Sequence, residues 1–300
     1  MAKFVALGAR EVTLIGQNVN SYHGAGAADE PRGRGTASPG RAFAGGAEPS
    51  QGPEEIARWR GTASPGRAFA GGAEPSQGSE QIDFAALLAM VDAVPGLLRV
   101  RFTTSHPKDF TPKVAEAFRD LPRLGSWLHL PVQSGSTRTL RRMVRGYTRE
   151  EYLARVEHVR ELVPDLSLST DIIVGYPGET DADFRETMTL LERCEFDSIY
   201  SFEYSERPDT PAQKLKLRDD VPAQVKAERL QEVQALQRGI TARRLARFVG
   251  RQVEVLVEGA SSRHAGQACG RSSGGQMVNF PLPCGSGAEA LAGRLVRVRI

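Results

Sequence analysis

The stretch that decides the fold is Leu166–Cys194, with the sequence LSLSTDIIVGYPGETDADFRETMTLLERC. Its opening run is rich in β-branched side chains and ends at glycine and proline, which predicts a buried strand. Apolar residues then recur at helical intervals from Phe184 to Leu191, and Thr180 with Asp183 is typical of a helix start. A strand followed at once by a helix indicates a parallel α/β protein, whose ligands bind at the carboxyl ends of the strands.

The same order of strand and helix recurs along the first two thirds of the chain. Polar residues follow the end of each predicted strand, and parallel strands place such ends at one edge of a sheet. We therefore predict an α/β fold in which a parallel sheet curls into part of a (β/α) barrel, with the polar clusters around one mouth. The predicted strands span residues 11–15, 97–102, 127–130, 166–174 and 198–204.

A low-complexity insertion interrupts this series over residues 24–78. The sequence of Arg34–Gly52 recurs identically as Arg60–Gly78. Two glycine-rich copies have too few apolar residues to stack as a solenoid, so the repeat indicates a duplication within a disordered insertion. The alternative is a functional arm in which Arg41 and Arg67 contact RNA.

The last third of the chain has a different pattern. A long helix is predicted over residues 221–249, and it carries several basic side chains, including Arg243 and Arg244. Short β segments with glycine turns follow, which predicts a small antiparallel barrel, a shape that often binds nucleic acid. The predicted domains are a partial barrel core (1–220), a connecting basic helix (221–249) and a β-barrel (250–300).

Composition sets limits on the class of protein. Three hundred residues with 40% hydrophobic and 25% charged side chains can form a large core and a second domain. We expect a cytoplasmic protein, because no run is long enough to span a membrane and Met1–Phe4 lacks the apolar core of a signal peptide. The net charge of +3 permits a nucleic-acid partner. Cys194, Cys269 and Cys284 are too scattered for a disulfide framework or a zinc site.

The predicted mouth gathers amide, hydroxyl, imidazole and carboxylate groups. Such a mixture suits a polar ligand that resembles adenosine or an amino acid. It contains no pair of carboxylates at a defined spacing and no Gly-x-Ser-x-Gly nucleophile. The candidates are Gln17, Asn18, Asn20, Ser105, His106, Gln133, Ser134, Asp171 and Glu179.

Structural alternatives exist for most of these residues. His106 precedes a proline and either caps its strand or acts as a base. Asp171 either orients a ligand in the barrel or satisfies a buried backbone group. Glu179 either stabilises the positive amino-terminal end of the next helix, which is the preferred interpretation, or takes part in chemistry. Gly175 and Gly178 either allow backbone to approach a ligand or only permit the turn.

Taken together, these segments resemble the radical S-adenosylmethionine (SAM) methylthiotransferases, specifically the MiaB-type branch that modifies tRNA. The tail, with Leu256–Gly259 and Val278–Phe280, resembles the RNA-binding TRAM domain. The resemblance covers nearly the whole chain outside the insertion. Its motifs are REVTLIGQNVN (10–20), RFTTSHP (101–107), HLPVQSGS (129–136), YTREEY (147–152), DIIVGYPGET (171–180) and YSFEYSERPDTP (200–211).

The resemblance implies an activity and its cofactors. Two [4Fe-4S] clusters and SAM would place a methylthio group on carbon 2 of an isopentenylated adenosine beside the tRNA anticodon. The protein would be a monomer that takes electrons and sulfur from partners and does not associate with membranes. Residues implied near the cofactor are Gln17, Asn18, Gln133, Ser134, Asp171 and Gly175, and those implied near the RNA substrate are Ser105, His106, Arg243, Arg244 and Arg271.

The sequence departs from the family pattern at the clusters. The family holds its radical cluster with a Cys-x-x-x-Cys-x-x-Cys loop and its second cluster with three further cysteines, and neither set exists here. Because iron–sulfur clusters need thiolate ligands, we expect this chain to bind no cluster and to be inactive alone, as a chain that begins inside the gene would be. The alternatives are a non-catalytic RNA-binding remnant, or an unrelated barrel enzyme that uses His106 and Asp171 as acid and base.

Overall fold

Five parallel strands form the centre of the fold, as the sequence predicts. The chain is described here by a computed structural model, which covers residues 1–16, 18–24, 82–103, 106–282 and 287–300. The strands are β1 (Glu11–Leu14), β4 (Arg99–Phe102), β5 (Trp127–His129), β6 (Ser167–Val174) and β7 (Ser198–Glu203). β1 pairs with β4, and β6 pairs with both β5 and β7. The segment before β5 joins these two groups of strands, because the Val100 N–H donates to Arg123 O (2.7 Å) and Val100 O accepts from Gly125 N (2.8 Å).

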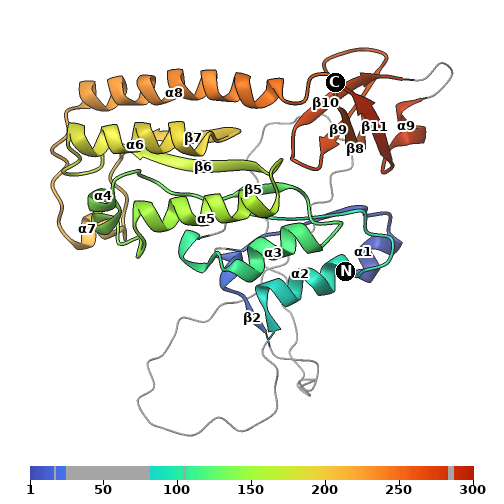
Figure 1. The fold of residues 1–300 in the computed structure, drawn as a ribbon, viewed down its shortest axis with the longest axis horizontal. Coiled ribbons are helices and arrows are strands. Elements are labelled where there is room, and N and C mark those ends of the chain that lie inside the picture. Colours follow the sequence, from blue (N-terminus) through green and yellow to red (C-terminus); the bar gives the residue numbers. More distant parts are fainter. Residues whose placement is uncertain (17, 25–81, 104–105, 283–286) are drawn as a thin grey trace, which may run out of the picture.

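Helices cover one face of this sheet and follow one another as neighbours in the order α2, α3, α5, α6 and α8 (Figure 1). Side chains at their amino ends explain where four of them begin: Asp83 caps α2, Thr111 caps α3, and Thr148 and Thr180 form capping boxes with Glu151 and Asp183 in α5 and α6. The helices are α2 (Phe84–Asp92), α3 (Pro112–Asp120), α5 (Arg149–Leu162), α6 (Asp181–Cys194) and α8 (Ala223–Ala246), with shorter α1 (Ala2–Ala6), α4 (Thr137–Arg142) and α7 (Pro211–Lys214).

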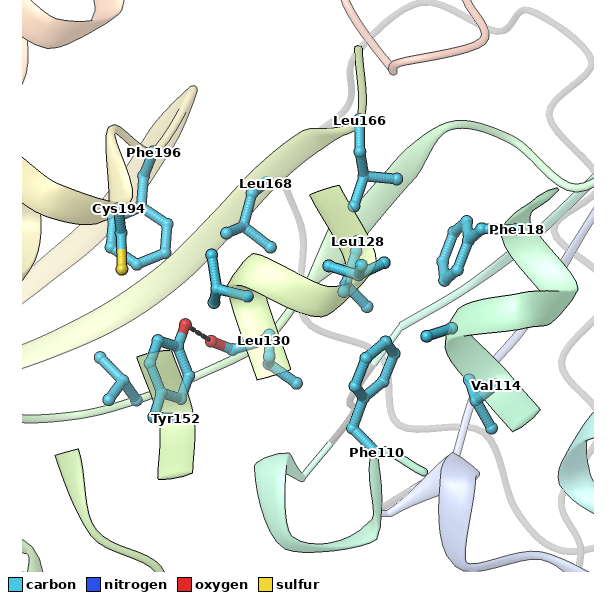
Figure 2. Packing of buried hydrophobic residues seen from close by; sticks show 14 of the residues in the cluster. Phe110, Val114, Phe118, Leu128, Leu130, Tyr152, Leu166, Leu168, Cys194 and Phe196 are labelled. Atoms are coloured by element: carbon cyan, nitrogen blue, oxygen red, sulfur yellow. Dashed lines mark hydrogen bonds between the residues drawn. The ribbon is translucent and has the colours of Figure 1, made fainter. Parts of the chain in front are cut away.

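The main core lies between the sheet and these helices (Figure 2). Leu128 and Leu168 come from adjacent strands and are fully buried beneath α5. Tyr152 of α5 is also fully buried, and its hydroxyl satisfies the requirement for a polar partner by donating to Leu130 O at 2.8 Å. Because strand side chains alternate, the residues between these apolar ones point to the opposite, inner face of the sheet.

Most predicted elements are present, with corrections at their ends. The strand predicted over 97–102 begins at Arg99, and the helix predicted over 221–249 spans Ala223–Ala246. The short helices α4 and α7 were not predicted. The 24–78 insertion, with Arg41 and Arg67, lies outside the described residues except for Gly24. That residue belongs to β2 (His23–Gly24), which pairs with β3 (Ile82–Asp83).

A second, antiparallel sheet forms the carboxyl-terminal part, in the order β10-β9-β8-β11. It surrounds its own small core of Val255, Val257, Ala268 and Phe280. The predicted β segments match it closely. Its elements are β8 (Gln252–Ala260), β9 (Gln267–Ser272), β10 (Met277–Pro281) and β11 (Leu295–Arg299), with α9 (Ala288–Leu291) before the last strand. No helix in the described part of the chain is long and apolar enough to cross a membrane.

The turn between β9 and β10, residues 272–276, packs against the amino-terminal ends of β4, β5 and β6. We call this segment the docking turn. Arg101 donates to Ser272 O at 2.8 Å, and Gln276 donates through Nε2 to Ser167 Oγ at 2.7 Å. Ser126 donates its N–H to Ser273 Oγ at 3.0 Å. These contacts fix the antiparallel sheet against the amino-terminal end of the parallel one.

Candidate functional site

The turn after β6 forms the best-defined part of the carboxyl edge of the parallel sheet. Gly175 and Gly178 have φ angles of 70° and 77°, a region that favours glycine. A Cβ on Gly175 would lie 2.3 Å from Lys226 Cγ, and one on Gly178 would lie 2.6 Å from an Arg142 nitrogen. Contact with the Lys226 side chain and the positive φ together explain Gly175, whereas the positive φ alone explains Gly178, because the tip of Arg142 can shift. A contact between Gly175 and a cofactor remains a prediction.

A buried ion pair holds this turn in place. Glu179, with 1% of its side chain exposed, accepts Gly175 N–H at 2.7 Å and pairs with Arg229 of α8 at 2.8 Å. Burial raises the pKa of Glu179, while the Gly175 N–H and Arg229 act in the opposite direction. A cavity of about 400 Å³ lies beside the pair. Asp181 and Asp220 line it; the first pairs with Arg229, and the second accepts the Gly178 N–H.

The ends of β1 and β4 are joined by a network of amides and carboxylates. Asn18 donates to Asp109 Oδ2 at 2.6 Å, and Ser21 donates to the same oxygen at 2.6 Å. Burial opposes these hydrogen bonds, but they prevail and lower the pKa of Asp109. His106 donates its backbone N–H to Asn20 Oδ1 at 3.1 Å. The two predicted residues Asn18 and His106 therefore lie together, and each is bound to neighbouring protein groups.

The His106 side chain also has a structural role. Its Nδ1 accepts Lys108 N–H at 3.2 Å and caps a short 3₁₀ turn, η2 (Pro107–Asp109), rather than the strand that the sequence interpretation had it cap. Burial, aided by nearby Arg145, lowers the pKa of His106. Its ring lies 5.7 Å from that of Tyr147, whose hydroxyl donates to Val132 O at 3.0 Å. This contact links the β4 edge to the segment after β5.

The segment after β5 contains Gln133 and Ser134, which the structure places differently. Gln133 has a φ of 75°, unusual for a residue other than glycine, and its backbone pairs with β6 through Asp171 O and Ile173 N. Ser134 is fully buried against α6, with its hydroxyl 3.4 Å from that of Thr187. Gln133 therefore lies at the edge beside β6, whereas Ser134 points into the helix packing.

Asp171 lies on the inner face of the sheet, one of the two locations proposed for it. Its Oδ1 is 3.5 Å from His129 Nε2, and His129 Nδ1 is 3.0 Å from Ser169 Oγ. The His129 ring lies between those of Trp127 and Tyr200, at centroid distances of 6.2 and 5.9 Å. Sequence reasoning missed this group. The alternation within WLH of β5 and SIYSFE of β7 was the signal that could have found it.

The predicted basic substrate residues lie far from the carboxyl edge. Arg244, near the end of α8, pairs with Asp197 at 3.2 Å and donates to Leu166 O. Arg243 is exposed and contacts Glu195, and Arg271 on β9 pairs with Glu258 at 2.8 Å. The structure therefore places these arginines around the carboxyl-terminal sheet and the end of α8.

The contacts above bring Asn18, His106, Gln133, Asp171 and Gly175 to one side of the parallel sheet. Gln17 and Ser105 lie outside the described residues. The acid–base role considered for His106 and Asp171 stays a prediction: His106 Nδ1 accepts Lys108 N–H, and Asp171 Oδ1 lies 3.5 Å from His129 Nε2.

The cysteines do not fit an iron–sulfur cluster. Cys194 is buried at the end of α6, where burial raises the pKa of its thiol to about 12. Cys269 lies on β9 in the other sheet, and Cys284 is outside the described residues. Within the described ranges, no three His, Cys, Asp or Glu side chains are placed to hold a metal ion. A cluster needs several thiolates at one point, and the two described thiols are in different domains.

Comparison with known proteins identifies both parts of the chain. The model of the radical SAM superfamily matches residues 40–191, and that of the TRAM domain matches residues 246–300. A protein of Burkholderia thailandensis named tRNA-2-methylthio-N(6)-dimethylallyladenosine synthase is 41% identical over 98% of this chain and 53% of its own length. A protein of the same name from Geobacter metallireducens is 42% identical over 99% of this chain and 54% of its own.

The chain thus spans about half the length of the curated relatives it matches. Among solved structures, the radical SAM enzyme coproporphyrinogen III oxidase (HemN) from Escherichia coli is similar over 51% of this chain and 36% of its own. Its sequence identity is 23% and the TM-score is 0.39.

Proposed function

Because the chain belongs to the radical SAM superfamily and carries a TRAM domain, we propose that it is part of a tRNA methylthiotransferase. Its target would be carbon 2 of N6-isopentenyladenosine beside the anticodon. The observation that carries the proposal is the similarity of both domains, in one continuous match, to relatives named for that synthase. SAM, iron–sulfur clusters, an electron donor, a sulfur source, a monomeric state and a cytoplasmic location belong to the same proposal.

The geometry supports a role for this chain in holding RNA. The docking turn joins the TRAM domain to the amino-terminal end of the parallel sheet through buried Arg99 and Arg101. An RNA bound to the TRAM domain would therefore be held in a fixed position relative to the radical SAM domain. The arrangement favours a two-domain enzyme that positions a large nucleic-acid substrate.

The cysteine content limits what these 300 residues can do. Since the thiols present do not fit a cluster, we assign no chemical step to them. We propose that the chain as it stands binds tRNA but does not methylthiolate it. A non-catalytic RNA-binding protein is the second candidate, and the same lack of cluster cysteines favours it.

Binding can be tested by titrating unmodified tRNA with the 300-residue chain at two salt concentrations. We expect weak binding that falls steeply with salt, because lysine and arginine side chains would contact phosphates. Binding that is absent, or independent of salt, would contradict the proposal.

A chimaera separates the two candidates. The part of the Burkholderia thailandensis relative that the match does not cover, joined to this chain, would supply the residues that the relative has in addition. After anaerobic reconstitution with iron and sulfide, an enzyme part should gain cluster absorbance and form 5′-deoxyadenosine from SAM. A chimaera that gains the absorbance but leaves SAM intact would favour the RNA-binding protein.

A further inference from the structure

Three aromatic side chains and one carboxylate lie together on the inner face of the parallel sheet. They belong to His129, Asp171, Tyr200 and Phe202, and we call this group the inner patch. In the ladders, His129 is the partner of Ser169, and Asp171 is the partner of Tyr200. Because paired residues point to the same face and side chains alternate, the four members project together, opposite the helices.

Two members of the inner patch are unusually exposed for large aromatic residues. Tyr200 is 55% exposed and Phe202 is 54% exposed. They occupy alternate positions of β7, so both rings lie on the face that the helices leave uncovered. The His129 ring meets the Tyr200 ring edge to face, with an interplanar angle of 79°, which fixes one side of Tyr200. The exposed side of Tyr200 remains available to another flat ring.

The polar part of the inner patch presents an acceptor. His129 Nδ1 is hydrogen-bonded to Ser169 Oγ at 3.0 Å, and its Nε2 lies 3.5 Å from Asp171 Oδ1. The His129 ring therefore lies against the Asp171 carboxylate on the inner face of the sheet. Asp171 is 27% exposed, so its second oxygen can accept a hydrogen bond from a group that lies over Tyr200.

The inner patch adjoins the TRAM domain. Trp127 precedes His129 on the same face, and its ring lies 3.6 Å from where a Cβ on Gly275 of the docking turn would be. The docking turn also contacts Ser167, two positions before Ser169 on β6. The face of the sheet that carries the inner patch is therefore continuous with the contact between the two domains.

We propose that the inner patch binds a purine base of the substrate RNA, with the base stacked on Tyr200 and a base N–H donating to Asp171. The inference rests on the proposed function for the identity of the RNA. Unpaired bases bind proteins by stacking on aromatic rings and by hydrogen bonds to their edges, and an exposed tyrosine beside a carboxylate offers both. An enzyme that acts on a base must also extract it from the RNA stack.

The test uses the full 300-residue chain and three anticodon stem-loop RNAs that differ only next to the anticodon. That position carries adenosine, purine riboside or an abasic site. We expect adenosine RNA to bind about tenfold more tightly than abasic RNA, the range for one base stacked on an aromatic ring. Tyr200→Ala should abolish this preference and Tyr200→Phe should keep it. Asp171→Asn should weaken binding of adenosine RNA but not of purine riboside RNA, which lacks the amino group.

The possible failures are distinguishable. If wild-type chain binds adenosine and abasic RNAs equally, the inner patch holds no base, while the proposed tRNA binding survives. If no stem-loop binds at all, the proposed function fails as well. If free SAM removes the preference for adenosine RNA, the inner patch takes the adenine of the cofactor and the RNA assignment is overturned. Because Tyr200 is exposed, its variants should fold, which circular dichroism can verify.

Discussion

Buried arginines lie at both ends of the parallel sheet, but those at one end link two domains, whereas the one at the other end neutralises a buried carboxylate. At the amino-terminal end, Arg99 and Arg101 both donate to the backbone carbonyl of Ser272 in the docking turn and share one partly exposed carboxylate, Glu11. At the carboxyl-terminal end, Arg229 neutralises Glu179, which is almost wholly buried and shapes the Gly175 turn. Loss of an arginine at the first end removes a link between domains, whereas loss at the second leaves a charge in the interior.

The largest effect should come from breaking the carboxyl-terminal pair. Arg229→Met leaves Glu179 buried and unpaired, so we expect the free energy of unfolding to fall by about 3–5 kcal/mol. Urea denaturation measures it. The matched control is Arg185→Met, which breaks an exposed pair with Glu232 and should change stability by less than about 1 kcal/mol. Equal losses of stability in the two variants would show that the buried Glu179–Arg229 pair contributes no more than an exposed ion pair.

The turn that Glu179 shapes gives the next test. Gly175→Ala should destabilise by about 2–3 kcal/mol, because it combines a left-handed φ with a clash against Lys226 Cγ. Gly250→Ala is the control, since Gly250 has a φ of 80° but no atom within 4 Å of the position that a Cβ would take. That variant should lose only about 1 kcal/mol, the contribution of the backbone alone. If Gly175→Ala and Gly250→Ala lost equal stability, the Lys226 side chain would have to move aside freely.

At the amino-terminal end, Arg101→Met removes a hydrogen bond to Ser272 O and the pair with Glu11. We expect a loss of about 2 kcal/mol, as for one charged hydrogen bond in a buried site. Hydrogen exchange of β9 and β10 should also accelerate, because the docking turn is released. Arg119→Met, on the exposed surface of α3, should change neither quantity. Unchanged exchange in Arg101→Met would show that other contacts suffice to hold the turn.

The smallest effect depends on pH and concerns Asp183 at the start of α6. Burial alone would raise the pKa of Asp183, but hydrogen bonds from Arg138, Ser136 and Thr180 outweigh it and hold that pKa well below the usual range. Because the folded pKa lies below the unfolded value, the stabilisation is present above about pH 4 and is lost as pH falls through the folded pKa.

Wild type should therefore exceed Asp183→Asn by about 1–2 kcal/mol at pH 7, and the gap should shrink below about pH 4. Unfolding curves of the two proteins at several pH values give this gap directly. A gap that stays constant down to about pH 3 would contradict the prediction, because it would mean that the charge of Asp183 contributes nothing.

Much of the fold could be predicted because it depends on local patterns. In the Leu166–Cys194 unit, the β-branched run predicts the strand and Thr180 with Asp183 predicts the helix start, and both are found. The carboxyl-terminal strands follow from glycine turns in the same way. The 6-residue helix α4 was missed because its residues, TRTLRR, lack a long apolar period.

The candidate site was predicted less completely, because its details depend on contacts between distant segments. Proximity to a strand end correctly grouped Asn18 with His106. It could not show that the Asn18 side chain already donates a hydrogen bond to Asp109. Nor could it show that Ser134 turns toward α6, or that Arg244 is held by Asp197. Polar side chains near a mouth can be used by the protein itself, and only the packing of other elements decides this.

Helix α8 has a consequence for how the family can vary. Its early residue Arg229 must face Glu179, while Arg244 near its end must face Asp197, and both requirements fall on one straight helix. Each added residue would rotate everything beyond it by about 100° and advance it by about 1.5 Å. Single insertions between the two arginines would thus set their directions out of phase. Lengthening by about seven residues, close to two full turns, would nearly restore the phase but displace the TRAM domain along the axis.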